Sequence, residues 1–161
     1  MVNTRPGRAG LWALAALVLG LGVAVSSARA SERGRDILEG PVMVDVVRII
    51  DGDTIAVRAH PWLGVFIETN VRLAGIDAPE LHGRCAEETD LALRAKERLT
   101  ELLAVGVARL DDIQHEKYGG RVRARVLDAS GADVGASLIA SGLARPYHGE
   151  RRRPWCREPG S

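Results

Sequence analysis

The sequence predicts a small α+β fold, mainly β, with five strands and two to three helices in one domain. Three observations support this class: segments in which apolar residues recur with period two, one long segment of helical period, and glycine or proline turn signals between them. Charged residues make up 27% of the chain and hydrophobic residues 46%. This composition excludes an intrinsically disordered protein.

The first three strands are predicted before the long helix. β-Branched segments cover residues 41–49 and 54–60, and the Asp-Gly-Asp turn at 51–53 separates them. A third strand is expected over 65–76, and the Ala-Pro pair at 78–79 ends it, because proline cannot continue a β-ladder.

The second half of the chain supplies the helices and the remaining strands. Leucine and alanine at helical spacing predict a helix over 87–106. Two strands follow over 107–113 and 122–127, and Asp133 is expected to cap a short helix that ends at Gly142. This order is compatible with a five-stranded oligonucleotide/oligosaccharide-binding (OB) barrel, although periodicity alone does not choose it over other α+β folds.

The first 30 residues have the pattern of a secretory signal peptide. They contain three arginines and no acidic residue, and an apolar or glycine run of 15 residues from Leu11 to Val25 precedes an Ala-x-Ala site ending at Ala30. We expect cleavage there and export to the periplasm or the medium. An uncleaved anchor is the less favoured alternative, since a membrane span usually needs about 20 apolar residues. The expected segments are a signal peptide (1–30), a flexible leader (31–41), one domain (42–156) and a tail (157–161).

Charge and cysteine content restrict the function further. Without the leader the net charge is −2, which excludes binding of nucleic acid through overall charge alone. The only cysteines are Cys85 and Cys156. Because an exported chain meets an oxidising compartment, we expect them to form a disulfide. Two cysteines without a nearby ligand cluster would be a poor zinc site.

Four carboxylates stand at predicted turns or strand ends: Asp51 and Asp53 in IDGDT, and Asp77 and Glu80 in IDAPE. Carboxylates that are crowded together repel one another unless a cation lies among them. Hard oxygen ligands of this kind suit calcium or magnesium rather than zinc. For Asp51 alone, an ordinary hairpin turn is the simpler explanation.

Two arginines could complement these carboxylates, Arg72 in the third strand and Arg121 at the start of the fifth. A planar guanidinium binds two phosphate oxygens at once. Arginines beside a carboxylate-held cation are what phosphodiester cleavage requires. Taken singly, each arginine is more simply explained as a solvated surface charge. The run at 151–153 is expected to be a solvated tail that could touch a phosphate backbone.

Four motifs in this order make the chain resemble the thermonuclease (staphylococcal-nuclease-like) family, as an exported bacterial-type member. The motifs are IIDGDTIAV (49–57), VRLAGIDAPE (71–80), EKYGGRVRARV (116–126) and GADVGASLIASGLARPY (131–147). The resemblance covers roughly residues 42–156. It implies a five-stranded OB barrel with helices, and calcium-dependent cleavage of DNA and RNA.

The resemblance also implies a role for each carboxylate. Asp53 and Asp77 match calcium ligands, and Ala78 matches a residue whose backbone carbonyl completes the metal shell. Asp51 matches an acid that approaches the ion through water. Glu80 matches the residue proposed as general base, or as organiser of the attacking water.

Substrate-binding positions follow in the same way. Arg72 and Arg121 match the two phosphate-binding arginines. Compared with the motif of the family, this sequence has one extra glycine, Gly120, before Arg121. We assign the second phosphate-binding position to Arg121 because the strand that follows it, VRARV, then aligns with the motif. The other implied substrate contacts are Lys117 and Tyr118, which match a pair that contacts a terminal phosphate and nucleotide, and, less closely, Tyr147.

The leading interpretation is an exported, calcium-dependent endonuclease that acts as a monomer on DNA and RNA, without stable membrane association once the leader is cleaved. The resemblance implies products with 3′-phosphate ends. A non-catalytic nucleic-acid-binding OB module is the main alternative, and a calcium-stabilised structural domain is another. The presence of Asp53, Asp77, Glu80 and Arg72 together favours the enzyme.

Overall fold

The computed structural model describes residues 37–116 and 120–156. The predicted signal peptide, Lys117, Tyr118 and the tail 157–161 therefore lie outside the described residues. No helix within the described ranges is long and apolar enough to cross a membrane.

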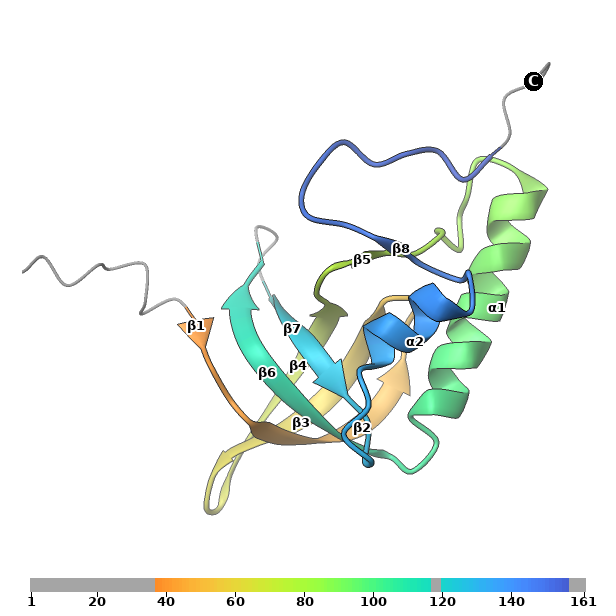
Figure 1. Cartoon of the computed structure of the whole chain (residues 1–161). Coiled ribbons are helices and arrows are strands. Elements are labelled where there is room, and N and C mark those ends of the chain that lie inside the picture. The colour runs from red at the N-terminus through yellow and green to blue at the C-terminus, as the bar shows by residue number, and fades with distance from the viewer. Residues whose placement is uncertain (1–36, 117–119, 157–161) are drawn as a thin grey trace, which may run out of the picture. The chain divides into compact units, whose positions relative to one another are not determined.

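Five strands form a closed barrel (Figure 1). Around the barrel β6 pairs with β2, β2 with β3, β3 with β4 and β4 with β7, and β7 returns to β6. Only the β4–β7 pair is parallel among these pairs. This arrangement confirms the predicted OB-type α+β barrel. The strands are β2 (Val42–Ile49), β3 (Thr54–Trp62), β4 (Val65–Leu73), β6 (Val107–His115) and β7 (Arg121–Leu127).

Three two-residue strands were not predicted from the sequence. β1 (Ile37–Leu38) pairs with β6, and β5 (Ile76–Asp77) pairs with β8 (Arg145–Pro146) in a separate two-stranded sheet. The third strand was expected to continue to residue 76. It instead ends at Leu73, because Gly75 has a φ of 78° in the left-handed region and redirects the chain into β5.

Two helices flank the barrel, α1 (Ala86–Leu102) and α2 (Val134–Ala140). The predicted cap of the second helix is confirmed: the side chain of Asp133 accepts a hydrogen bond of 2.9 Å from the backbone N–H of Ala136. The first helix ends a few residues before the predicted limit.

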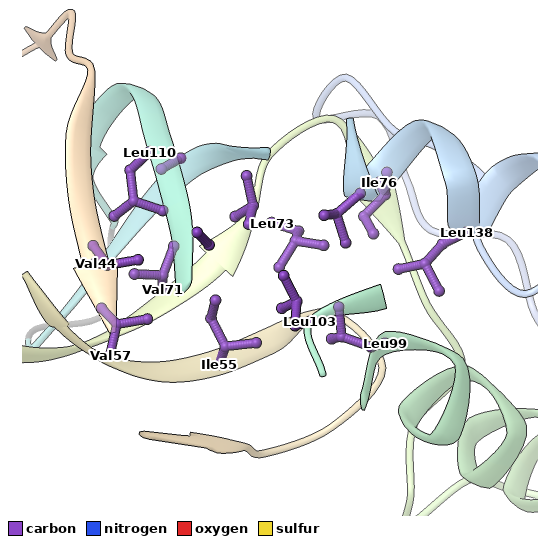
Figure 2. Packing of buried hydrophobic residues seen from close by; sticks show 14 of the residues in the cluster. Val44, Ile55, Val57, Val71, Leu73, Ile76, Leu99, Leu103, Leu110 and Leu138 are labelled. Atoms are coloured by element: carbon purple, nitrogen blue, oxygen red, sulfur yellow. The ribbon is translucent and has the colours of Figure 1, made fainter. Parts of the chain in front are cut away.

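The hydrophobic core fills the barrel and the space between the barrel and both helices. Figure 2 shows Val44, Ile55 and Val71 from the strands together with Leu99 of α1 and Leu138 of α2. Side chains alternate between the two faces of a strand. Since Val71 and Leu73 are buried in the core, the intervening Arg72 leaves the barrel on its outer face.

Candidate active site

The turn between β2 and β3 is pressed against two other parts of the chain. A Cβ atom on Gly52 would lie 2.8 Å from Cβ of Ala95 in α1 and 3.2 Å from Cβ of Ala78. Only glycine permits this approach, and it brings Asp53 next to the segment that follows β5. A side-chain oxygen of Asp51 accepts the backbone N–H of Asp53 at 3.0 Å, which closes the turn.

Arg72 of β4 and Asp53, the residue just before β3, form a bidentate ion pair. The register places Arg72 opposite Thr54, next to Asp53. Nη1 of Arg72 lies 2.7 Å from Oδ1 of Asp53, and Nη2 lies 2.6 Å from Oδ2. Both side chains are largely buried, with 12% and 5% exposed. Burial raises the pKa of Asp53 to about 6, and the positive charge of Arg72 opposes that rise.

Asp77 and Glu80 share a second arginine, Arg152, in the segment 147–156 that follows β8 and is called the tail from here on. Nε of Arg152 lies 3.0 Å from Oδ1 of Asp77, and Nη1 donates to Oε1 of Glu80 at 2.6 Å. Asp77 is buried, whereas the side chain of Glu80 is 55% exposed. Partial burial disfavours the charged form of Arg152, but the hydrogen bond to Glu80 and the charges of Asp77, Glu80 and Asp53 outweigh it and raise the pKa.

These contacts bring four of the predicted residues into one electrostatic cluster: Arg72, Asp53, Asp77 and Glu80 interact directly or through Arg152. Beside the cluster is a hollow of about 760 Å³, lined by Asp77, Ala78, Glu80 and tail residues 151–156 among others. The tail was expected to be a solvated segment that could reach phosphate. In the structure Arg152 binds the carboxylates instead.

Arg121 lies near this cluster on the sheet but has a different partner. It begins β7 opposite Asn70 of the parallel strand β4, so its side chain leaves on the same outer face as that of Arg72. Nε of Arg121 lies 2.5 Å from Oε2 of Glu116. Within the described residues it makes no ion pair with the site carboxylates.

The register also identifies Arg123, rather than Arg121, as the residue directly opposite Arg72. Arg123 donates a hydrogen bond of 2.9 Å to Gln114. It lines a second hollow, of about 530 Å³, together with Tyr147. Tyr147 does not line the 760 Å³ hollow beside Asp77 and Glu80, but it shares a small cleft of about 10 Å³ with Asp77 and Arg152.

Glu88 is a structural residue of the site that sequence reasoning missed. It is buried on the first turn of α1 and accepts the backbone N–H of Arg84 at 2.9 Å and of Glu80 at 3.5 Å. A Cβ atom on Gly83 would lie 2.6 Å from Cγ of Glu88. Glu88 therefore determines the path of the loop that carries Glu80. Its position at the third residue of the helix was an available signal, because an acid there commonly binds the preceding backbone N–H groups.

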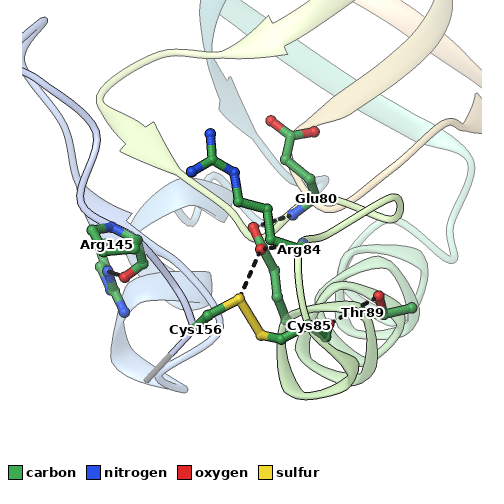
Figure 3. Close-up of a disulfide and its surroundings, with 8 residues drawn as sticks. Glu80, Arg84, Cys85, Thr89, Arg145 and Cys156 are labelled. Atoms are coloured by element: carbon green, nitrogen blue, oxygen red, sulfur yellow. Dashed lines mark hydrogen bonds between the residues drawn. A yellow bond between two sulfur atoms is a disulfide. The ribbon is translucent and has the colours of Figure 1, made fainter. Parts of the chain in front are cut away.

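The predicted disulfide between Cys85 and Cys156 is present, with Cα atoms 5.9 Å apart. Figure 3 shows it joining the tail to the start of α1, close to Glu80 and Arg84. The guanidinium of Arg145 stacks on Trp155 with 3.6 Å between Cζ and the ring centroid. Because the sulfurs are bonded to each other, they are not available as thiolate ligands.

Loss of the disulfide should lower stability. The bond closes a loop with a sequence separation of 71 residues, and the chain-entropy model assigns such a loop about 4 kcal/mol. We expect Cys156→Ser, or reduction of the natural chain, to lower the melting temperature by about 10 °C. Calorimetry with and without reductant measures this shift.

The control for that prediction is the double variant Cys85→Ser/Cys156→Ser, whose melting temperature should not respond to reductant. Two free thiols per chain, titrated on denatured but unreduced protein, would contradict the pairing.

The donor set fits a hard divalent cation. Carboxylates of Asp53 and Asp77 and the carbonyl of Ala78 are oxygen donors on adjacent segments. Among the described residues, Oδ1 of Asp77 is buried and accepts no hydrogen bond of good geometry, although it lies in ion-pair contact with Arg152. An oxygen that already attracts a cationic side chain is suited to a metal ion.

The outer rim of this OB barrel combines buried carboxylates with a largely buried arginine and an exposed glutamate, groups that can hold a cation and stabilise negative charge on a phosphate. The family model of staphylococcal nuclease homologues matches residues 70–157, more than half of the chain, and the chain belongs to this family. Nucleic acids are accordingly its class of substrate, and nucleases of this family are generally metal-dependent. Among curated proteins, none matches the chain.

Proposed function

We propose that this protein is a calcium-dependent endonuclease that hydrolyses phosphodiester bonds of DNA and RNA. The observation that carries the proposal is the convergence of the Asp53–Arg72 pair with Asp77 and Glu80 beside one hollow. A barrel that only bound nucleic acid would not require buried carboxylates, which repel phosphate, at this position.

Metal binding is assigned to the buried donors. Asp53, Asp77 and the backbone carbonyl of Ala78 would hold calcium, and Asp51 would contribute through a water molecule. The ion, when bound, supplies Lewis-acid stabilisation of negative charge on the phosphate oxygens. These donors lie on the 51–53 turn and at residues 77–78, where β5 ends, two segments that the contact of Gly52 with Ala78 keeps together.

The remaining chemistry belongs to the side chains of the chain itself. Arg72, held in position by Asp53, binds the scissile phosphate and stabilises the charge that develops on it. Arg121 would supply the second guanidinium. Glu80 is exposed enough to contact water and would accept a proton from the attacking water molecule. Attack in line with the departing 5′ oxygen would leave 3′-phosphate ends.

The proposed location is the periplasm or the medium, with a monomer as the active form. The amino-terminal pattern of residues 1–30 supports export. The Cys85–Cys156 disulfide is in keeping with it, because disulfides persist in oxidising compartments.

The test is digestion of supercoiled plasmid and of RNA by the purified mature chain, in calcium and in excess chelator. We expect cleavage of both substrates in calcium alone, and conversion of closed circles to nicked and linear forms would show that the enzyme is an endonuclease. Full activity in excess chelator would refute the metal requirement. Binding without cleavage in calcium would favour the non-catalytic OB module.

A further inference from the structure

Arg152 occupies the position of a cation among the site carboxylates. It contacts Asp77 at 3.0 Å and Glu80 at 2.6 Å, and it is stabilised by the charge of Asp53. Two of these acids, Asp53 and Asp77, are the proposed metal ligands. Among the proposed metal ligands, the guanidinium contacts Oδ1 of Asp77 directly, so an ion that binds this oxygen competes with that contact and is repelled by the charge of Arg152.

The tail that carries Arg152 is attached to the domain on both sides of this residue. Before it, β8 pairs with β5, and the N–H of Tyr147 donates to the carbonyl of Gly75 at 2.9 Å. After it, Cys156 is bonded to Cys85. A guanidinium expelled from the carboxylates therefore stays beside the same hollow.

A displaced guanidinium beside the site needs a new anionic partner. The side chain of Arg152 is 42% exposed at the border of the hollow, and neither attachment involves its guanidinium. The anion that enters this hollow during the proposed reaction is the phosphate of the substrate. Arginine is the side chain best suited to bind it, since its fork matches two phosphate oxygens.

We propose that Arg152 is a third phosphate-binding arginine, which is held on Asp77 and Glu80 in the metal-free protein and transferred to the substrate when the metal binds. This inference rests on the proposed nuclease site. It adds a residue of the tail to the phosphate-binding group, and it makes the metal affinity depend on that residue.

The first measurement is calcium affinity, by calorimetry on the full mature chain without nucleic acid. Arg152→Gln removes the competing cation and should tighten calcium binding by about tenfold. The matched control is Arg153→Gln, which removes the same charge from the same hollow at a residue that forms no ion pair with Asp77 or Glu80 among the described residues. The control should change the affinity by less than about twofold.

The second measurement is binding of a labelled single-stranded oligonucleotide in calcium, by fluorescence anisotropy. A Glu80→Gln background slows cleavage in every sample and leaves the contact of Arg152 with Asp77. Adding Arg152→Gln should weaken binding about tenfold and reduce the slope of log affinity against log salt by about one. Adding Arg153→Gln should do neither.

Three results would overturn the inference: unchanged calcium affinity in Arg152→Gln, equal effects of Arg152→Gln and Arg153→Gln, or unchanged oligonucleotide binding in Arg152→Gln. Neither measurement requires turnover. A natural chain that binds calcium and oligonucleotide but does not cleave would therefore refute the endonuclease proposal while the role of Arg152 is still decided.

Discussion

Replacing Asp77 with asparagine should lower phosphodiester cleavage by about 100-fold or more, and Asp53→Asn should do the same. Each substitution keeps the size of the side chain but removes an anionic metal ligand. Asparagine is the better probe at position 53, because alanine would leave the guanidinium of Arg72, only 12% exposed, without its bidentate partner. Cleavage rates measured over a range of calcium concentrations would show the loss.

The matched control for these two variants is Asp45→Asn. Asp45 lies on β2 and pairs with His60 at 2.9 Å, with about half of its side chain exposed. The Asp45→Asn variant should therefore retain full cleavage activity. Melting curves without metal would separate loss of a ligand from loss of the fold. If Asp77→Asn cleaved as fast as the wild-type protein, Asp77 would not be a metal ligand, and the proposed reaction would lose its main support.

The barrel strands and both helices could be predicted because their sequence pattern follows directly from where their side chains lie. In β4, Val71 and Leu73 are buried and Arg72 is outside, so the period-two alternation records the inner and outer faces. β5 and β8 have two residues each, which is too short to leave a periodic pattern. Their pairing depends on contacts between parts of the chain that are distant in sequence.

The site was predictable only in part, for the same reason. Asp53, Asp77 and Arg72 were identified through motifs, and the structure places them in one cluster. The contact between Arg152 and Glu80 joins residues 72 positions apart, which neither spacing nor local propensity specifies. Glu88 was missed because the residue three positions before it is Cys85 and not the Ser or Thr of a capping box, so the sequence signature of a helix start is incomplete.

Arg121→Lys should lower turnover by about 100-fold, because lysine keeps the charge but loses the planar fork that binds two phosphate oxygens. The assignment depends on which residue after Tyr118 is the clamp. Gly120 has a φ of 86°, a conformation that favours glycine, and Arg121 is the first residue of β7. The extra glycine thus belongs to the turn, and the arginine belongs to the strand. To bind phosphate, Arg121 must exchange Glu116 for the substrate.

Arg123→Lys is the matched control, and it is a stringent control because Arg123 lies close to both Arg121 and Arg72 in the sheet. Arg123 lies two residues further along the same outer face and directly opposite Arg72, yet it borders the other hollow with Tyr147. If Arg121 is the clamp, Arg123→Lys should change turnover by less than about threefold. Equal losses at the two positions would show that the one-residue shift is wrong. A larger loss at Arg123 would show that Arg123 binds the phosphate. Its position opposite Arg72 in the sheet would then be a better guide than the sequence motif, which selects Arg121. Steady-state kinetics of the two variants at saturating calcium decide between these outcomes.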